Sequence, residues 1–374
     1  MKILIISSQS KDSGTFTKLK RFTFNLSLAL LTILVFFVVF EAVIRIFAPQ
    51  DLMIELRNYV EKDKLCGFKL KRNYKSRWRW HEFDIWVKTN SHGLRSPEIR
   101  PKRKDTTRIL CIGDSFTMGH GVNERNSYPR QLEDILNKYS EEKKYEVINA
   151  GVINYNIENY LLYFKHYGLK LEPDIIIIGL FIGNDLKTRN NNIITIKEKT
   201  AIRKLHRFKV FLGEHVQSYI FIRNRIKRSY RLHLLFAKIG LMPYPSPPNI
   251  INIFNKNNTD EEFKTNFDKI EEIIQIASNN HIKIILLLIP DSIQVYPKIW
   301  ERLLGDFKLS KELFDLKKPN SLIKRRFETV ISIIDPLNAL RKNSNKQLYY
   351  KIDRHLTREG HRVIAESIVK SLKI

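Results

Sequence analysis

An unbroken run of apolar residues, IIIIGLF, in the stretch from Asp174 to Phe181 constrains the fold of this chain more than any other stretch. Isoleucine favours strands, and a strand with no polar alternation needs cover on both of its faces. Strands of this kind occupy the centre of parallel sheets that carry helices on both sides. The run therefore predicts an α/β protein with a buried parallel sheet.

The rest of the chain from residue 108 onward alternates apolar runs typical of strands with amphipathic runs typical of helices. This alternation indicates parallel βαβ units in a doubly wound sheet. The expected strands are 108–113, 145–149, 174–181, 282–289 and 330–334, and the expected helices are 126–139, 156–169, 261–279 and 358–372.

The first expected strand runs into the stretch from Arg108 to Gly121, RILCIGDSFTMGHG. The strand breaks at Gly113 and delivers Asp114 and Ser115 to a turn before a helix, which is a place to expose a nucleophile. Most serines in such turns only cap the helix. Three further polar clusters follow later strands, and they are Asn149-Ala150-Gly151, Gly183-Asn184-Asp185 and Asp353-Arg354-His355.

The candidate catalytic residues are Ser115, His355 and Asp353. A serine hydroxyl needs a neighbouring base, and because an unperturbed imidazole titrates near neutral pH, His355 is the natural candidate. Asp353 lies two residues earlier, where extended backbone would point its carboxylate to the same side and let it hold the ring. Taken alone, His355 is equally a surface histidine near a helix start, so the pattern depends on the whole set.

The candidate oxyanion donors are the backbone N–H of Ser115, the backbone N–H of Gly151 and the side-chain amide of Asn184. Attack on an ester carbonyl creates an oxyanion, and a glycine offers its N–H without a Cβ in the way. Taken alone, Gly151 is better interpreted as an ordinary turn glycine and Asn184 as a cap at the end of a strand. All three follow parallel strands, where ligands of open α/β sheets bind near the topological switch point.

These blocks resemble the SGNH, or GDSL-type, hydrolase superfamily over about residues 105–374. Ser115, Gly151, Asn184 and His355 match the four residues of the family name. The resemblance implies a flavodoxin-like three-layer α/β/α fold and a serine hydrolase with an acyl-enzyme intermediate. The last block reads DxH instead of the usual DxxH, which is similar to relatives that modify extracellular polysaccharide and leaves the role of Asp353 open. No cofactor is implied.

A charge-free segment from Phe22 to Phe40 precedes the α/β pattern. Its length suffices to cross a bilayer as a helix, and no small-x-small cleavage site follows, so an uncleaved anchor is favoured over a signal peptide or a buried core helix. The basic residues ahead of it predict a cytoplasmic N-terminus and an outward-facing remainder. We expect a basic cytoplasmic tail at 1–21, a transmembrane anchor at 22–48, a juxtamembrane connecting region at 49–104 and the catalytic domain at 105–374.

Two regions outside the expected sheet have alternative interpretations. The tryptophans Trp78, Trp80 and Trp86 of the connecting region either stack on a sugar or lipid or, as is more common, pack on the main domain. A basic insertion at about 190–258 carries apolar residues near helical spacing. Its helices either lie on anionic lipid, cap the active site, or dock on the surface as ordinary solvated helices.

The formal charge of +26, from 65 basic and 39 acidic residues, does not by itself identify a partner. Basic residues are spread along the chain and no zinc-finger, helix-turn-helix or RNP-type signature is present, so nucleic acid is not expected. Anionic lipid or an acidic glycan fits equally well. The two cysteines, Cys66 and Cys111, do not suggest a disulfide framework, and no metal site is expected from His and Cys spacing.

The sequence thus predicts a membrane-anchored enzyme that transfers an acyl group from an ester of a cell-surface glycan or lipid to Ser115. Water as acceptor makes it an esterase, and a sugar hydroxyl makes it an O-acyltransferase. A non-catalytic glycan- or lipid-binding module and a nucleic-acid-binding protein are the other classes considered. The oligomeric state is left open.

Overall fold

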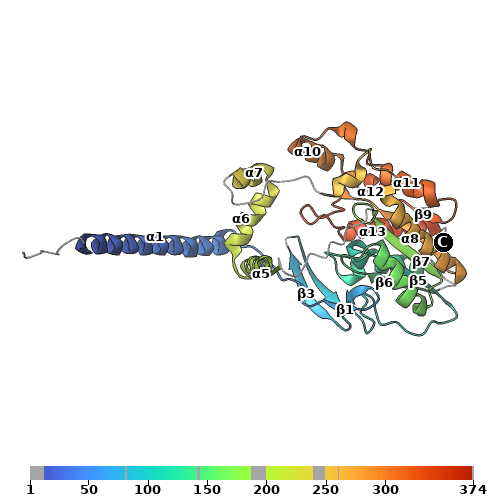
Figure 1. Ribbon diagram of the computed structural model, residues 1–374. Helices are drawn as coiled ribbons and strands as arrows, with labels where there is room; N and C mark the ends of the chain where they lie inside the picture. The colour runs from blue at the N-terminus through green and yellow to red at the C-terminus, as the bar shows by residue number, and fades with distance from the viewer. Residues whose placement is uncertain are drawn as a thin grey trace, which may run out of the picture.

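The computed structural model describes residues 12–80, 82–140, 144–186, 199–238, 249–259 and 261–372. A long N-terminal helix leads to a small group of helices, and beyond them lies the α/β body that carries the sheet (Figure 1). Parts of the sequence predictions fall outside the described residues, among them 1–11 of the tail and both 190–198 and 239–248 of the basic insertion.

The α/β body is built on one sheet of five parallel strands in the order β6-β5-β7-β8-β9. This is the flavodoxin-like order, and it confirms the predicted fold class. The order reverses between β5 and β7, so the carboxyl ends of these two strands border the expected ligand site. The strands are β5 (Thr106–Gly113), β6 (Lys144–Gly151), β7 (Ile175–Phe181), β8 (Lys283–Ile289) and β9 (Ser332–Ile334).

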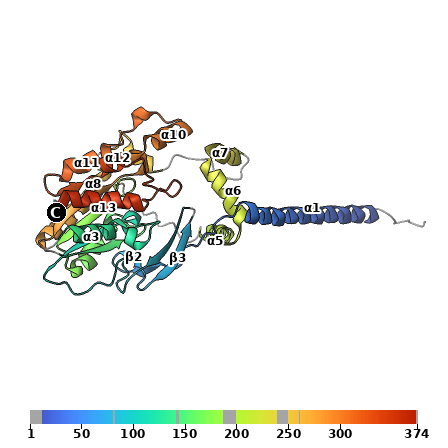
Figure 2. The same cartoon turned by 180° about the vertical axis from the view of Figure 1, so that it is seen from behind.

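Helices cover both faces of the sheet, as the continuous apolarity of β7 requires. On one face, Ile109 and Cys111 of β5 pack with α3 (Tyr128–Tyr139) and α13 (Arg358–Leu372). Figure 2 shows α3 and α13 side by side on this face. On the other face, Leu110 and Ile112 pack with α4 (Ile157–Tyr163) and α8 (Glu261–Asn279). Alternate residues of one strand therefore serve two separate cores.

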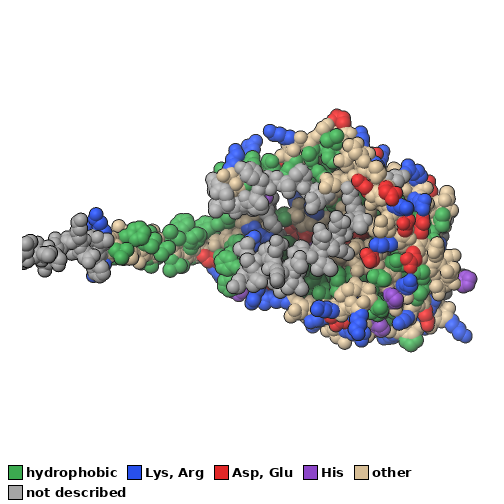
Figure 3. Space-filling view, viewed as in Figure 1, with side chains coloured by type: hydrophobic (Ala, Val, Ile, Leu, Met, Phe, Trp, Pro, Cys, Tyr) green, Lys and Arg blue, Asp and Glu red, His purple; other side chains and the backbone are tan. Residues whose placement is uncertain are grey.

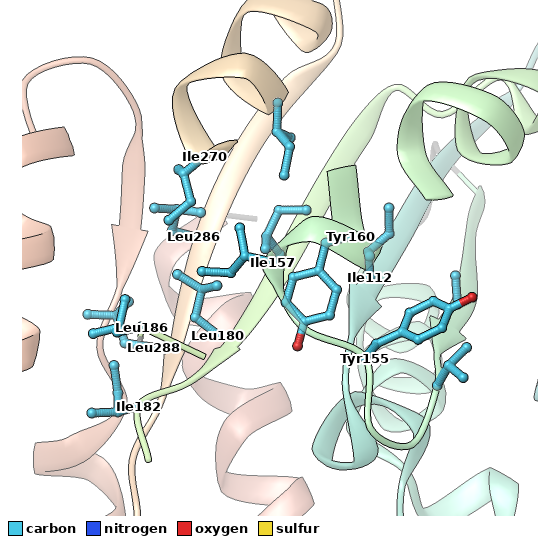
Figure 4. Packing of buried hydrophobic residues seen from close by; sticks show 14 of the residues in the cluster. Ile112, Tyr155, Ile157, Tyr160, Leu180, Ile182, Leu186, Ile270, Leu286 and Leu288 are labelled. Atoms are coloured by element: carbon cyan, nitrogen blue, oxygen red, sulfur yellow. The ribbon is translucent and has the colours of Figure 1, made fainter. Parts of the chain in front are cut away.

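The core under α4 and α8 surrounds the strand ends that lead to the site. Tyr155, Ile157 and Tyr160 lie beside Ile112 of β5, and Leu180 and Leu286 lie beside Ile270 of α8 (Figure 4). The hydroxyl of the fully buried Tyr160 donates to Asp185 Oδ2 at 2.9 Å. The same oxygen accepts the Phe181 N–H at 2.9 Å, so Asp185 has a structural role.

Most predicted elements are present, with differences at their ends. The helices predicted at 261–279 and 358–372 are found as α8 and α13 with those bounds. The helix predicted at 156–169 is wrong as a single helix, because α4 changes at Phe164 to a π-type turn and then to a 3₁₀ turn. Gly168, in the π-type turn, lies so close to Leu110 that a Cβ there would be 3.0 Å from its side chain.

Several further elements were not predicted from the sequence. They are α2 (Ser115–Met118), α9 (Ser292–Val295), α10 (Pro297–Phe307), α11 (Lys318–Phe327), α12 (Leu337–Lys342) and the 3₁₀ turns Glu124–Asn126, Asn249–Phe254 and Lys311–Leu313. The helix predicted at 126–139 begins at Tyr128, with Pro129 in its first turn.

The connecting region forms two antiparallel hairpins that pack on the α/β body. One joins β1 (Val60–Asp63) to β2 (Gly67–Leu70), and the other joins β3 (Lys75–Trp80) to β4 (Phe83–Lys88). Phe83, Ile85 and Val87 are buried in the main core. Trp78 and Trp80 pack against the same core, while Trp86 is half exposed. Packing therefore accounts for two of the three tryptophans.

The N-terminal helix α1 (Asp12–Phe47) projects away from the body (Figure 1). Its part from Lys18 to Phe47 is long and apolar enough to cross a membrane and is almost wholly uncovered by the rest of the chain. Three helices of the basic insertion, α5 (Lys199–His215), α6 (Gln217–Arg228) and α7 (Tyr230–Lys238), lie between this helix and the α/β body.

Candidate active site

Ser115 is the first residue of α2, directly after the turn that ends β5. The Asp114 side chain caps this helix by accepting the Phe116 N–H at 2.9 Å. Gly113 permits the tight turn, because a Cβ there would lie 2.0 Å from the Thr117 hydroxyl and 3.0 Å from the Gly179 carbonyl of β7. The local sequence thus places the serine hydroxyl at the carboxyl edge of the sheet.

His355 lies 240 positions further along the chain, and its Nε2 is 2.8 Å from the Ser115 hydroxyl oxygen. The other ring nitrogen, Nδ1, is 2.7 Å from Oδ1 of Asp353. A proton on Nδ1 that is donated to the carboxylate leaves Nε2 as the acceptor for the serine proton. The structure therefore brings the three predicted catalytic side chains into one chain of hydrogen bonds, in the arrangement that a serine nucleophile requires.

The loop that carries Asp353 and His355 is a turn, so the expected extended backbone between them is wrong. Arg354 adopts a left-handed conformation with φ of 72°, and its guanidinium donates to Asp291 Oδ1 at 2.8 Å. The turn brings the two side chains together across a single intervening residue. The short DxH spacing is therefore compatible with the aspartate–histidine contact.

Glu82, from the turn between β3 and β4, holds this loop from outside the predicted catalytic domain. Its carboxylate accepts the N–H groups of Lys351, Ile352 and Asp353 at 2.8, 2.7 and 2.9 Å. Three backbone donors on one carboxylate fix the direction in which the loop presents its side chains. Nothing in the local sequence around Glu82 indicates this role.

His120 is a second histidine on the carboxylate of Asp353. Its Nε2 is 3.0 Å from Asp353 Oδ2, and its ring is stacked on that of His355 with centroids 3.9 Å apart. Trp78 of β3 meets the His120 ring edge to face at 4.4 Å. Burial, aided by the nearby His355, lowers the pKa of His120 to about 4, so His120 is neutral near pH 7 and donates its Nε2 proton to the carboxylate.

The carboxyl groups of Asp353 and Asp114 have opposite electrostatic environments. Burial would raise the pKa of Asp353, but hydrogen bonds from His120 and His355 outweigh it and hold that pKa well below the usual range. Burial raises the pKa of Asp114 to about 6 against the opposing hydrogen bond from Phe116. Asp353 is thus the ionised partner of His355, whereas Asp114 caps the turn that carries Ser115.

The predicted oxyanion donors differ in the hydrogen bonds that they already make. Among the hydrogen bonds of the described residues, none uses the N–H of Ser115, which starts α2. Asn184 is exposed in the turn after β7, and its side chain lies near enough to Asp114, beside the serine, to help lower the pKa of that carboxyl against the larger effect of burial. Both groups are therefore close to the serine turn.

Gly151, the third predicted donor, already has an acceptor for its N–H, Asn149 Oδ1 at 3.0 Å. A Cβ at Gly151 would lie 2.2 Å from the backbone nitrogen of Met118, so glycine is needed there for close packing of α2 on β6. An oxyanion role for this N–H remains a prediction, and it would require exchange of the present acceptor.

Arg95 of the connecting region holds the segment that carries His120. Its guanidinium is fully buried and donates to the carbonyls of Met118, Gly119 and Val122 at 3.1, 2.6 and 2.6 Å. The arginine ends the stretch NSHGLR, from Asn90 to Arg95, whose composition is typical of a turn. Its role was not predicted, because its partners lie more than twenty positions away.

His120, Asp353 and His355 are also the one group in the described residues whose ligand atoms lie close enough together, within 4.8 Å, to hold a metal ion. In this structure the facing nitrogens of both rings are hydrogen-bonded to the carboxylate. A metal bound by these nitrogens would have to replace both of those hydrogen bonds. The donor set therefore fits a proton-transfer site better than a metal site.

Fold and site together define a doubly wound α/β protein with a serine–histidine–aspartate arrangement at the carboxyl edge of its sheet. No protein-family model matches the sequence, and no curated protein matches it either.

Two solved structures illustrate what the chain is similar to. A protein from Desulfitobacterium hafniense DCB-2, assigned to the lipolytic G-D-S-L family, is 18% identical with a TM-score of 0.37, over 71% of this chain and 99% of that one. Axe2, an acetylxylan esterase from Geobacillus stearothermophilus, is 14% identical with a TM-score of 0.40, over 73% and 97%. At these scores the comparison by itself assigns no activity to this chain, so the chemistry rests on the site geometry.

Proposed function

We propose that this chain is a membrane-anchored serine hydrolase that acts on ester bonds of an acylated glycan or lipid at the cell surface. The observation that carries the proposal is the hydrogen-bonded chain from Ser115 Oγ through His355 to Asp353, at 2.8 and 2.7 Å. A serine hydroxyl paired with a neutral imidazole is poised for attack on a carbonyl carbon.

In the proposed reaction, Ser115 Oγ bonds to the ester carbonyl carbon while its proton passes to Nε2 of His355. The carbonyl oxygen becomes the oxyanion, which the N–H of Ser115 and the amide of Asn184 are suited to stabilise. Collapse of this intermediate breaks the ester C–O bond, and His355 returns the proton to the leaving alcohol. Water, activated by the same imidazole, then hydrolyses the acyl-enzyme.

A sugar hydroxyl in place of that water turns the same site into an O-acetyltransferase, because the acyl-enzyme is common to both reactions. The DxH spacing, which resembles relatives that modify polysaccharide, favours keeping this second candidate. Incubation with p-nitrophenyl acetate, with and without a glycan acceptor, separates the two. Nitrophenol release that rises with the acceptor supports transfer, whereas release that is indifferent to it supports hydrolysis.

The proposed topology places the N-terminus in the cytoplasm and the α/β body outside. It is supported by the apolar helix from Lys18 to Phe47 and by the basic residues before its charge-free part. An introduced cysteine at Tyr139, whose side chain is 66% exposed, tests it with an impermeant maleimide. Labelling in intact cells supports the outward orientation, and protection until the cells are lysed contradicts it.

A further inference from the structure

The three insertion helices α5, α6 and α7, which we call the collar, are fastened to the end of the apolar helix α1. Glu41 of α1 accepts the N–H groups of Gln217 and Ser218, at the start of α6, at 3.0 and 2.8 Å. Arg45, one turn further along α1, donates to the carbonyl of His215 at 2.9 Å. These contacts hold the junction of α5 and α6 at a defined height along α1.

That height coincides with the end of the charge-free segment. The nineteen residues from Phe22 to Phe40 span about 28 Å at about 1.5 Å per residue, close to the thickness of a hydrocarbon core of about 30 Å. Glu41 is the next residue, so a bilayer that covers the charge-free segment ends where the collar begins. Figure 1 shows α6 running across the direction of α1 at this level.

The collar combines exposed apolar side chains with an excess of positive charge. Its sequence from Lys199 to Lys238 contains eleven Lys and Arg residues against a single acid, Glu214, which pairs with Arg57 of the connecting region. Figure 3 shows apolar side chains continuing from α1 onto the collar, with Lys and Arg side chains nearby. The exposed apolar residues are Phe208, Phe211, Ile222, Leu232 and Leu235.

We infer that the collar lies in the headgroup layer of the membrane that α1 crosses, with its aromatic and aliphatic side chains inserted and its cations on anionic lipid headgroups. Amphipathic helices with basic residues and exposed phenylalanine and leucine bind such interfaces. Each cation close to an anionic surface adds to the attraction. The inference rests on the proposed membrane anchoring and goes beyond it, because it assigns a lipid-binding surface to the insertion.

The collar is also connected to the candidate active site through strand β3. The guanidinium of Arg223 in α6 lies over the ring of Trp80 at 5.2 Å. Trp78, two residues earlier on β3, contacts His120, which shares Asp353 with His355. A collar seated on lipid would therefore hold the serine at a fixed height above the headgroups, and the substrate ester would be one presented close to the membrane surface.

Spin labels on the full chain reconstituted into vesicles test this placement. Single cysteines replace Phe208 and Phe211 in the collar, Val330 on the α/β body and Phe36 in α1, and the native Cys66 and Cys111 are buried. The vesicles contain phosphatidylglycerol and phosphatidylcholine, or phosphatidylcholine alone. Collision with oxygen and with a water-soluble nickel chelate reports the depth of each label. Val330, 65% exposed against 57% for Phe208, is the matched aqueous control.

We expect the Phe208 and Phe211 labels in phosphatidylglycerol vesicles to collide with the nickel chelate several-fold less often than the Val330 label. The protection should weaken in pure phosphatidylcholine. Collar labels as accessible as Val330, with the Phe36 label in hydrocarbon, overturn the collar inference and leave the anchor standing. A Phe36 label that is itself accessible overturns the anchoring. Equal protection in both lipids overturns the role of the anionic headgroups.

Discussion

The imidazole rings of His120 and His355 are stacked with centroids 3.9 Å apart and planes 16° from parallel. Both rings hydrogen-bond to the same carboxylate, one on each oxygen of Asp353. Two imidazolium ions at that distance would repel each other, so one ring must stay neutral while the other accepts the serine proton. The burial that lowers the pKa of His120 to about 4 assigns the neutral state to His120.

This relationship predicts that His120 is a positioning residue for the aspartate. The His120→Phe variant keeps a ring in the stack but removes one donor from an ionised carboxylate, a loss of about 1.5 to 3 kcal/mol in hydrogen-bond energy. We expect kcat to fall by about tenfold, with KM little changed and the acidic limb of the pH–rate profile displaced. The His120→Gln variant retains a donor at the place of Nε2 and should recover most of the activity. Equal kcat in wild type and His120→Phe would contradict this role.

Glu82 should matter for activity, although it lies 271 positions from Asp353. The Glu82→Ala variant leaves the three N–H groups of residues 351–353 without their carboxylate, and the loop that carries the catalytic pair loses its fixed direction. We expect kcat to fall by at least about tenfold, because a misplacement near 1 Å in a catalytic group has large effects. Circular dichroism should show a folded protein. A folded variant with unchanged kcat would show that Glu82 does not position the catalytic loop.

The sequence predicted the sheet and the serine turn, because both depend on residues close together in the chain. The apolar run of β7 and the glycine turn before Ser115 are local patterns with one good structural solution. His120, Glu82 and Arg95 escaped prediction as site residues, since their roles come from contacts with residues far away in sequence. Arg95, for instance, could be read only as part of a turn until its guanidinium was seen on the carbonyls of residues 118–122.

A substitution at Gly151 tests whether glycine is needed there for close packing of α2 on β6. A methyl group at this position would lie 2.2 Å from the Met118 nitrogen, which is backbone and has little freedom to move. We expect Gly151→Ala to destabilise the protein by several kcal/mol, or to prevent folding, as overpacking in a core does. Gly305 in α10 is the matched control, because nothing lies within 4 Å of its added Cβ. Gly305→Ala should be neutral or stabilise by about 0.5 to 1 kcal/mol. Similar unfolding midpoints for the two variants would contradict the packing role.

The burial of His361 predicts how the free energy of unfolding depends on pH. Its Nδ1 accepts the Tyr128 N–H at 3.2 Å, and burial lowers the pKa of His361 from 6.5 to about 3. The folded state therefore favours the neutral ring. Its contribution to stability is present above pH 6.5 and is lost as the pH falls from 6.5 toward 3, by about 2 kcal/mol at pH 5.

The His361→Asn variant keeps an acceptor near Nδ1 but cannot take up a proton. Between pH 7 and pH 5, its melting temperature should fall by a few degrees less than that of the wild type. Thermal unfolding at the two pH values measures this difference. Parallel shifts in wild type and variant would mean that His361 is not the group that titrates.

The most direct test of the central claim is covalent labelling of the full-length protein with a serine-directed fluorophosphonate, followed by mass spectrometry of the labelled peptide. We expect an adduct on Ser115 in the wild type, no adduct there in Ser115→Ala, and labelling slowed by orders of magnitude in His355→Ala. A folded wild-type protein that stays unlabelled, or that carries the adduct on another serine, would contradict the account.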